Sequence, residues 1–91
     1  MLTMNNIEVN NGTITFNDID TIEKGTTVFI STGKTDLYME SNTNTSISNW
    51  IDLIVATYNV IEDKDTTAIK ADSSIVFDNI NDIEMDVGST I

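Results

Sequence analysis

The sequence of 91 residues predicts an α+β fold, in which a small antiparallel β-sheet packs on one central amphipathic helix. Short segments of alternating apolar and polar residues, separated by turns rich in Gly, Asn and Asp, predict the strands. One longer stretch in the middle of the chain repeats its apolar residues at helical spacing. A chain of this length forms one domain around one core. Residues 1–91 are therefore expected to form a single acidic α+β domain with about five to seven short strands.

Two β-hairpins are expected before the helix. The first joins Ile7–Val9 to Thr13–Phe16 through Asn11-Gly12, a dipeptide that readily adopts the positive φ angles of a tight turn. The second joins Thr26–Thr32 to Thr35–Ser41 through a turn that contains glycine and lysine. Along its return strand, Leu37 and Met39 should lie on one face and Tyr38 and Glu40 on the other.

The helix is expected at about 46–61, after a polar loop at 42–45 that ends in residues typical of helix caps. Its apolar residues form a continuous stripe over about four turns. The stripe consists of Ile47, Trp50, Ile51, Ile54, Tyr58 and Ile61. After the helix, three short strands and a frayed tail are expected at 67–71, 74–77, 83–87 and 89–91.

An internal repeat relates two segments on either side of the helix. Residues 14–23 and 75–84 match at an offset of sixty-one residues, with isoleucine at three equivalent positions and Phe and Glu at one each. Each copy reads as a strand, then a turn rich in Asn and Asp, and then the start of another strand. The repeat predicts a pseudo-symmetric pair of sheet corners beside the helix. Chance similarity in a composition rich in Ile, Asn and Asp is the alternative.

The composition argues against most enzymatic chemistry. The chain contains no histidine and no cysteine, which removes the commonest general bases, thiol nucleophiles and nitrogen or sulfur metal ligands. It also contains no arginine, so it lacks the side chain that clamps phosphate in a bidentate manner. We therefore expect a protein that is not an enzyme and that carries no cofactor or metal ion.

Two local motifs approach known ligand-binding loops and fail on their spacing. Gly33-Lys34-Thr35 lacks the upstream glycine of a phosphate-binding loop and lies in a hairpin turn. Asp63-Lys64-Asp65 follows the helix as in an EF-hand, but Ala68 and Ser74 stand where that loop needs glycine and glutamate. A weaker, irregular calcium site among the Asn- and Asp-rich turns is left open as an alternative.

The charge balance is the strongest indication of function. Fifteen acidic residues stand against four lysines, which gives a formal net charge of −11. Direct binding to nucleic acid is not expected, because phosphates would repel this charge. Carboxylates that imitate phosphates would instead attract a basic surface on another protein. The candidate residues for this contact are Asp18, Asp20, Glu23, Glu62, Asp63, Asp65, Asp78, Asp82, Glu84 and Asp86.

The predicted function is non-enzymatic inhibition by nucleic-acid mimicry. Small chains rich in Asn and Ile are typical of phages and mobile elements of low-GC bacteria, so the expected partner is a host nuclease, repressor or defence complex, as for an anti-CRISPR protein. A phage assembly protein that forms homo-oligomers through its sheet and a small host regulatory adaptor are the alternatives. The start of the chain lacks the basic and apolar segments of a signal peptide, and the longest apolar run, 53–56, is far too short to span a membrane. A cytoplasmic protein without a membrane partner is expected.

Overall fold

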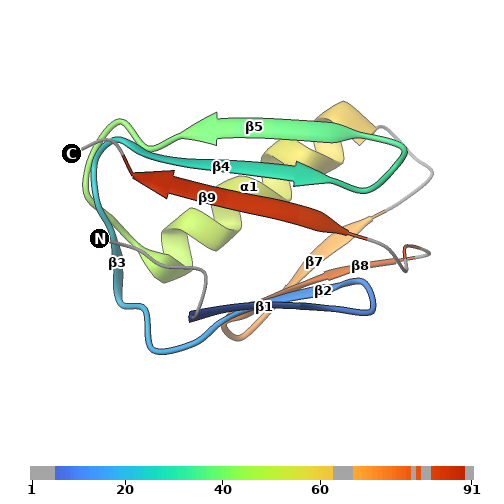
Figure 1. The fold of residues 1–91 in the computed structure, drawn as a ribbon, viewed down its shortest axis with the longest axis horizontal. Coiled ribbons are helices and arrows are strands. Elements are labelled where there is room, and N and C mark those ends of the chain that lie inside the picture. The colour runs from blue at the N-terminus through green and yellow to red at the C-terminus, as the bar shows by residue number, and fades with distance from the viewer. Residues whose placement is uncertain (1–5, 63–66, 79, 81–82, 90–91) are drawn as a thin grey trace.

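The computed structural model describes residues 6–62, 67–78, 80 and 83–89, and it has the predicted α+β architecture (Figure 1). One central helix packs against short antiparallel strands, of which the described residues form nine. The strands are distributed over three small sheets, where the sequence predicted one sheet of five to seven strands. The difference arises because alternation predicts each strand separately and carries no information on which strands are neighbours.

The four-stranded sheet combines the first hairpin with the hairpin that follows the helix. Its order is β1-β2-β8-β7, and the predicted turns lie where expected. Asn11 and Gly12 both adopt positive φ, at 48° and 82°, as a tight hairpin turn requires. The four strands are β1 (Ile7–Asn10), β2 (Thr13–Phe16), β7 (Ala68–Ala71) and β8 (Ser74–Phe77).

The three-stranded sheet has the order β5-β4-β9 and joins the second predicted hairpin to the end of the described chain. Its strands are β4 (Thr26–Ser31), β5 (Asp36–Glu40) and β9 (Glu84–Ser89). Ser89 pairs with Thr26, so the prediction of a frayed tail was wrong for Ser89, and Thr90 and Ile91 lie outside the described residues. A third, two-stranded sheet pairs β3 (Thr21–Ile22) with β6 (Thr45–Ser46), part of which was predicted as loop.

Helix α1 spans Ile47–Glu62 and follows β6 directly. The hydroxyl oxygen of Ser46 accepts a hydrogen bond from the backbone N–H of Asn49 at 3.2 Å, so Ser46 caps the helix, one residue beyond the predicted capping loop. The centre of the predicted stripe is buried, but Ile61 is 47% exposed. The buried residues of the helix are Trp50, Ile51, Ile54 and Tyr58.

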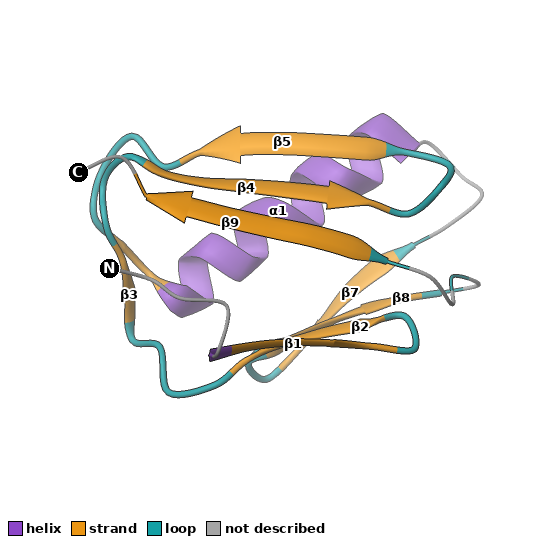
Figure 2. Ribbon diagram, viewed as in Figure 1, coloured by secondary structure: helices purple, strands orange, loops and turns teal. Residues whose placement is uncertain are grey.

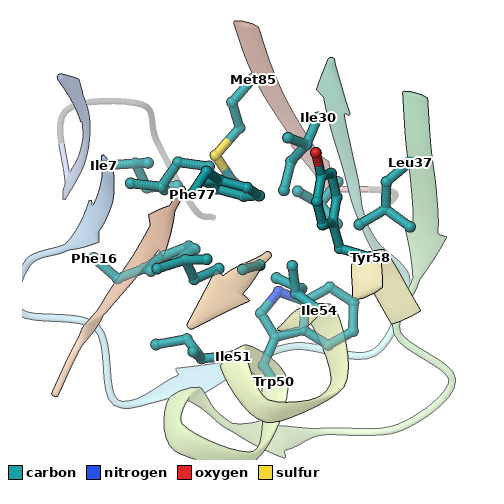
Figure 3. Packing of buried hydrophobic residues seen from close by; sticks show 14 of the residues in the cluster. Ile7, Phe16, Ile30, Leu37, Trp50, Ile51, Ile54, Tyr58, Phe77 and Met85 are labelled. Atoms are coloured by element: carbon teal, nitrogen blue, oxygen red, sulfur yellow. The ribbon is translucent and has the colours of Figure 1, made fainter. Parts of the chain in front are cut away.

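The core lies between the two larger sheets, and α1 covers one side of it (Figures 2 and 3). The helix packs against β7 and β8 of one sheet and against β5 of the other. Trp50 is 2% exposed and is among the largest buried side chains. The rings of Tyr58 and Phe77 meet edge to face, with centroids 4.9 Å apart and planes at 80°. This geometry ties the helix to the four-stranded sheet beyond simple burial of area.

The internal repeat appears in the structure as a local pseudo-twofold axis within the four-stranded sheet. Strands β2 and β8 are antiparallel neighbours, and their register pairs Ile14 with Ile75, which are equivalent residues of the two copies. The hairpins β1–β2 and β7–β8 also share one register at the same offset, since Ile7 pairs with Phe16 as Ala68 pairs with Phe77. The two copies therefore lie side by side in one sheet.

Backbone hydrogen bonds outside the strand ladders obey the same symmetry. The N–H of Phe16 donates to Ser73 O at 2.9 Å, and the equivalent N–H of Phe77 donates to Gly12 O at 2.8 Å. A second equivalent pair is Asn17 N to Asn6 O at 2.7 Å and Asp78 N to Thr67 O at 2.8 Å. The repeat reaches beyond the predicted segments into β1 and β7. The copies then diverge, because β3 and β9 enter different sheets.

Candidate functional site

Among the described residues, the acids predicted to bind a partner lie on several separate elements. Because β2 and β8 run antiparallel, the turns that follow them lie at opposite ends of the four-stranded sheet (Figure 1). Asp18, Asp20 and Glu23 follow β2 at one end, and Asp78 follows β8 at the other. Of the remaining candidates, Glu62 ends α1 and Glu84 and Asp86 lie on β9, while Asp63, Asp65 and Asp82 lie outside the described residues.

The three acids after β2 border a shallow hollow of about 210 Å³. Ile19, Ile22 and Thr26 also line it. Across the described part of the chain, no group of three or more acidic side chains is arranged to hold a metal ion.

Glu62 takes part in a polar network that joins the last turn of α1 to the turn between β4 and β5. The buried Tyr58 hydroxyl donates to Thr32 Oγ1 at 3.2 Å, and the Thr32 side chain also bonds to the backbone of Thr35. The Thr35 hydroxyl donates to the carboxylate of Glu62. Glu62 is half-buried, and its hydrogen bond with Thr35 holds this hairpin turn against the helix.

Because of Tyr58, the folded protein should lose stability at alkaline pH. Burial raises the pKa of the Tyr58 hydroxyl above its usual value of 10.0, and the negative charge of Glu62 adds to this, while the hydrogen bond with Thr32 acts in the opposite direction. As pH rises, the unfolded chain loses the tyrosine proton before the folded chain does. The contribution of Tyr58 to the free energy of unfolding should therefore be constant below about pH 10 and fall above it.

Urea unfolding between about pH 8 and about pH 11 checks this expectation. Tyr58→Phe should lose less stability over this range than the wild type. Tyr38→Phe is the matched control, because that ring is 64% exposed and its variant should follow the wild type. Equal pH dependence in the wild type and Tyr58→Phe would contradict the expectation.

Four carboxylates share the outer face of the three-stranded sheet. Val28 and Ile30 point into the core, so the alternate residues of β4 and the residues paired with them face outward. Phe29 lies in the central row, between Tyr38 on β5 and Asp86 on β9. We call this surface the acidic sheet face and define it by Phe29, Asp36, Tyr38, Glu40, Glu84 and Asp86.

The four carboxylates of this face surround its two aromatic rings. Ser31 separates Asp36 from Glu84 in one row, and Glu40 pairs with Thr27 in the row beyond Tyr38. All four are exposed, and β4, β5 and β9 contain no lysine. Carboxylates two residues apart on one strand stand about 7 Å apart, where two charges repel by roughly 0.6 kcal/mol in water. The face is thus electrostatically suited to a cationic partner.

None of the three lysines in the described residues lies on a strand of this face, and Lys24 lies in the turn between β3 and β4. Lys70, on β7, pairs with Asp52 of the helix at 3.1 Å, and its ammonium also bonds to Ser48. This ion pair stabilises the contact between α1 and the four-stranded sheet. Lys34 lies in the turn between β4 and β5, beyond the end of both strands.

Two carboxylates of the face, Asp36 and Glu40, were not among the predicted site residues. The alternation along the return strand put Tyr38 and Glu40 on one side of that strand, and these are two of the six residues of the face. The rest of the grouping depends on the pairing of β9 with β4, which brings Asp86 beside Phe29 and Glu84 beside Ser31 across more than fifty residues of chain. Local periodicity has no means of detecting this pairing.

In the described ranges, no helix is both long and apolar enough to cross a bilayer. The molecule is compact, with extents of 35 × 22 × 20 Å. The chain matches no protein-family model, and no curated protein or solved structure matches it significantly.

Proposed function

We propose that this protein is a non-enzymatic inhibitor that uses the acidic sheet face to occupy the nucleic-acid-binding surface of a basic protein. The observation that carries the proposal is the grouping of four exposed carboxylates around Phe29 and Tyr38, on strands that contain no lysine. Such a face offers both the charge that a basic groove attracts and a central apolar contact, as protein interfaces require.

The spacing of the charges supports mimicry of nucleic acid. The carboxylates occupy the rows from residue 36 to residue 40, a length of roughly 14 Å at about 3.4 Å per residue. Spread over β5 and β9, four charges in this length average about one charge per 3.4 Å, the charge density of one strand of DNA. The excess negative charge of the whole chain would also speed association with a basic groove and make binding weaken as salt rises.

The expected setting is the cytoplasm of a bacterial host, with the protein encoded by a phage or mobile element. The partner would then be a nuclease, a repressor or a defence complex that must bind DNA or RNA. A chain without His, Cys or Arg supports a function by binding, because the commonest catalytic side chains are missing.

Affinity capture with matched variants tests the proposal. The bait is the tagged protein in a lysate of a low-GC Gram-positive bacterium, with elution by a salt step or by added duplex DNA. The wild type should recover a basic nucleic-acid-binding protein that DNA displaces. Neutralising the face with Asp36→Asn, Glu40→Gln, Glu84→Gln and Asp86→Asn should abolish recovery, since these exposed residues carry the contact.

The control variant removes the same number of charges elsewhere, with Asp18→Asn, Asp20→Asn, Glu23→Gln and Asp78→Asn. It should recover the partner as the wild type does. Equal recovery by the face variant, or a captured protein that DNA does not displace, would contradict the proposal.

Self-assembly is the second candidate, and a separate observation favours it. Large apolar side chains are exposed on the helix and on the outer face of the four-stranded sheet, where they can bury surface against another copy. Recovery of the bait alone would favour this function and leave the charge as a solubility feature. The exposed side chains are Leu53 at 50%, Val60 at 79%, Ile61 at 47%, Ile69 at 54% and Val76 at 37%.

A further inference from the structure

Tyr38 is an unusual residue for the centre of a charged face. Its side chain is 64% exposed, and its hydroxyl has no hydrogen-bond partner in the part of the chain that the structure describes. It stands on β5 between Asp36 and Glu40, which project from the same side of the strand. An exposed ring in this position adds little to the stability of the fold, so its role lies in what the ring can contact.

The neighbours of Tyr38 extend the aromatic surface across the sheet. Phe29 pairs with Tyr38 on one side and with Asp86 on the other, so the central row reads tyrosine, phenylalanine, aspartate. Phe29 is half-buried, while Tyr38 is exposed to solvent. Asp86 therefore lies directly beside Phe29, and Asp36 and Glu40 each lie two residues from Tyr38 on the same strand.

This arrangement discriminates between the two basic side chains. A guanidinium group is planar and can stack on an aromatic ring while its N–H groups reach a neighbouring carboxylate in a fork. An ammonium group is a compact, strongly hydrated charge that gains less from the ring. Tyr38, with Asp36 and Glu40 on either side of it along β5, thus fits arginine better than lysine.

The spacing of Asp36, Tyr38 and Glu40 along β5 also indicates the conformation of the partner. Alternate side chains of an extended segment stand about 7 Å apart, which is the spacing of Asp36, Tyr38 and Glu40 along β5. We propose that the acidic sheet face binds an extended, arginine-bearing segment of its partner, with one guanidinium stacked on Tyr38. The inference rests on the proposed function and names the chemistry that the face recognises.

Two synthetic peptides test it at low ionic strength. Both are acetylated and of equal length and charge; one alternates glycine with arginine and the other alternates glycine with lysine. Titration followed by NMR should shift resonances of β4, β5 and β9 with both peptides, and the arginine peptide should bind about two- to fivefold tighter. Tyr38→Leu keeps an apolar side chain without a π face and should bring the two affinities together.

Conservative and distant variants complete the test. Tyr38→Phe should keep the preference for arginine, because the ring and not the hydroxyl is the proposed contact. Circular dichroism of Tyr38→Leu verifies that the exposed site tolerates the change. Equal affinities for both peptides in the wild type, or an arginine preference that survives Tyr38→Leu, would overturn the inference and leave the proposed function standing. If neither peptide shifts the face, the inference and the proposed function fail together.

Discussion

Gly12→Ala should destabilise the protein by roughly 2–5 kcal/mol, the largest effect we expect from a single added methyl group. Gly12 has φ +82°, a left-handed conformation that costs an alanine about 1–2 kcal/mol. A Cβ at this position would also collide with the backbone carbonyl oxygen of Ile80 and press on that of Phe77. The turn cannot move aside easily, because Gly12 O accepts the N–H of Phe77.

Gly33→Ala separates the two causes. Gly33 has nearly the same φ, +83°, but a Cβ there would meet nothing within 4 Å. This variant should therefore lose only the conformational cost of about 1–2 kcal/mol. The midpoints of urea unfolding for the two variants measure the difference. Equal losses would show that the close approach of Ile80 to the first hairpin turn has no energetic weight.

Asn59→Ala is the second substitution with a large expected effect, because Asn59 covers the open edge of a sheet. Strand β7 is an edge strand of the four-stranded sheet, so the backbone groups on its outer side have no neighbouring strand. The Asn59 amide donates to Ala68 O at 2.9 Å and accepts from Ala68 N at 2.8 Å, as a paired strand would. Ala68 is only 2% exposed, so water cannot fully replace these bonds. We expect a loss of about 1–3 kcal/mol.

Asn49→Ala serves as the control, since it makes the same replacement in the same helix at an exposed position. Its side chain has no partner among the described residues, so the variant should be nearly neutral in urea unfolding. Asn59→Asp is informative as well, because a carboxylate can accept from Ala68 N but cannot donate to Ala68 O. It should fall between the wild type and Asn59→Ala. A neutral Asn59→Ala would mean that the clamp does not stabilise the strand.

The repeat shows how far a sequence comparison within one chain can reach. The shared Ile, Phe and Glu positions predicted two similar β-turn units, and the symmetric pairing of Ile14 with Ile75 agrees with that prediction. The comparison did not predict that the copies are adjacent. The adjacency requires β2 and β8, about sixty residues apart, to pair with each other. The apolar residues of each copy can be buried by any neighbouring strand, so they do not specify which strand that is.

The candidate site was only partly accessible to sequence reasoning. The sequence predicted ten acidic residues for the contact and left open whether they share one face; in the structure, the acids that follow β2 and Asp78 after β8 lie at opposite ends of the four-stranded sheet. The two predicted residues that do lie on the acidic sheet face, Glu84 and Asp86, come from a strand. Carboxylates on a strand are held at a regular spacing by the pleat, which a turn does not provide.

The sequence by itself determined the α+β class, both hairpins, the position of the helix, the internal repeat and the strong negative charge. These properties depend on periodicity and turn chemistry within about ten residues, which local sequence carries. Only the tertiary structure decided that β9 pairs with β4, that Asn59 covers β7, and that four carboxylates surround Tyr38 and Phe29. Each of these is a contact between distant segments. It is selected by the packing of the whole core around Trp50 and Tyr58, and no single segment contains that information.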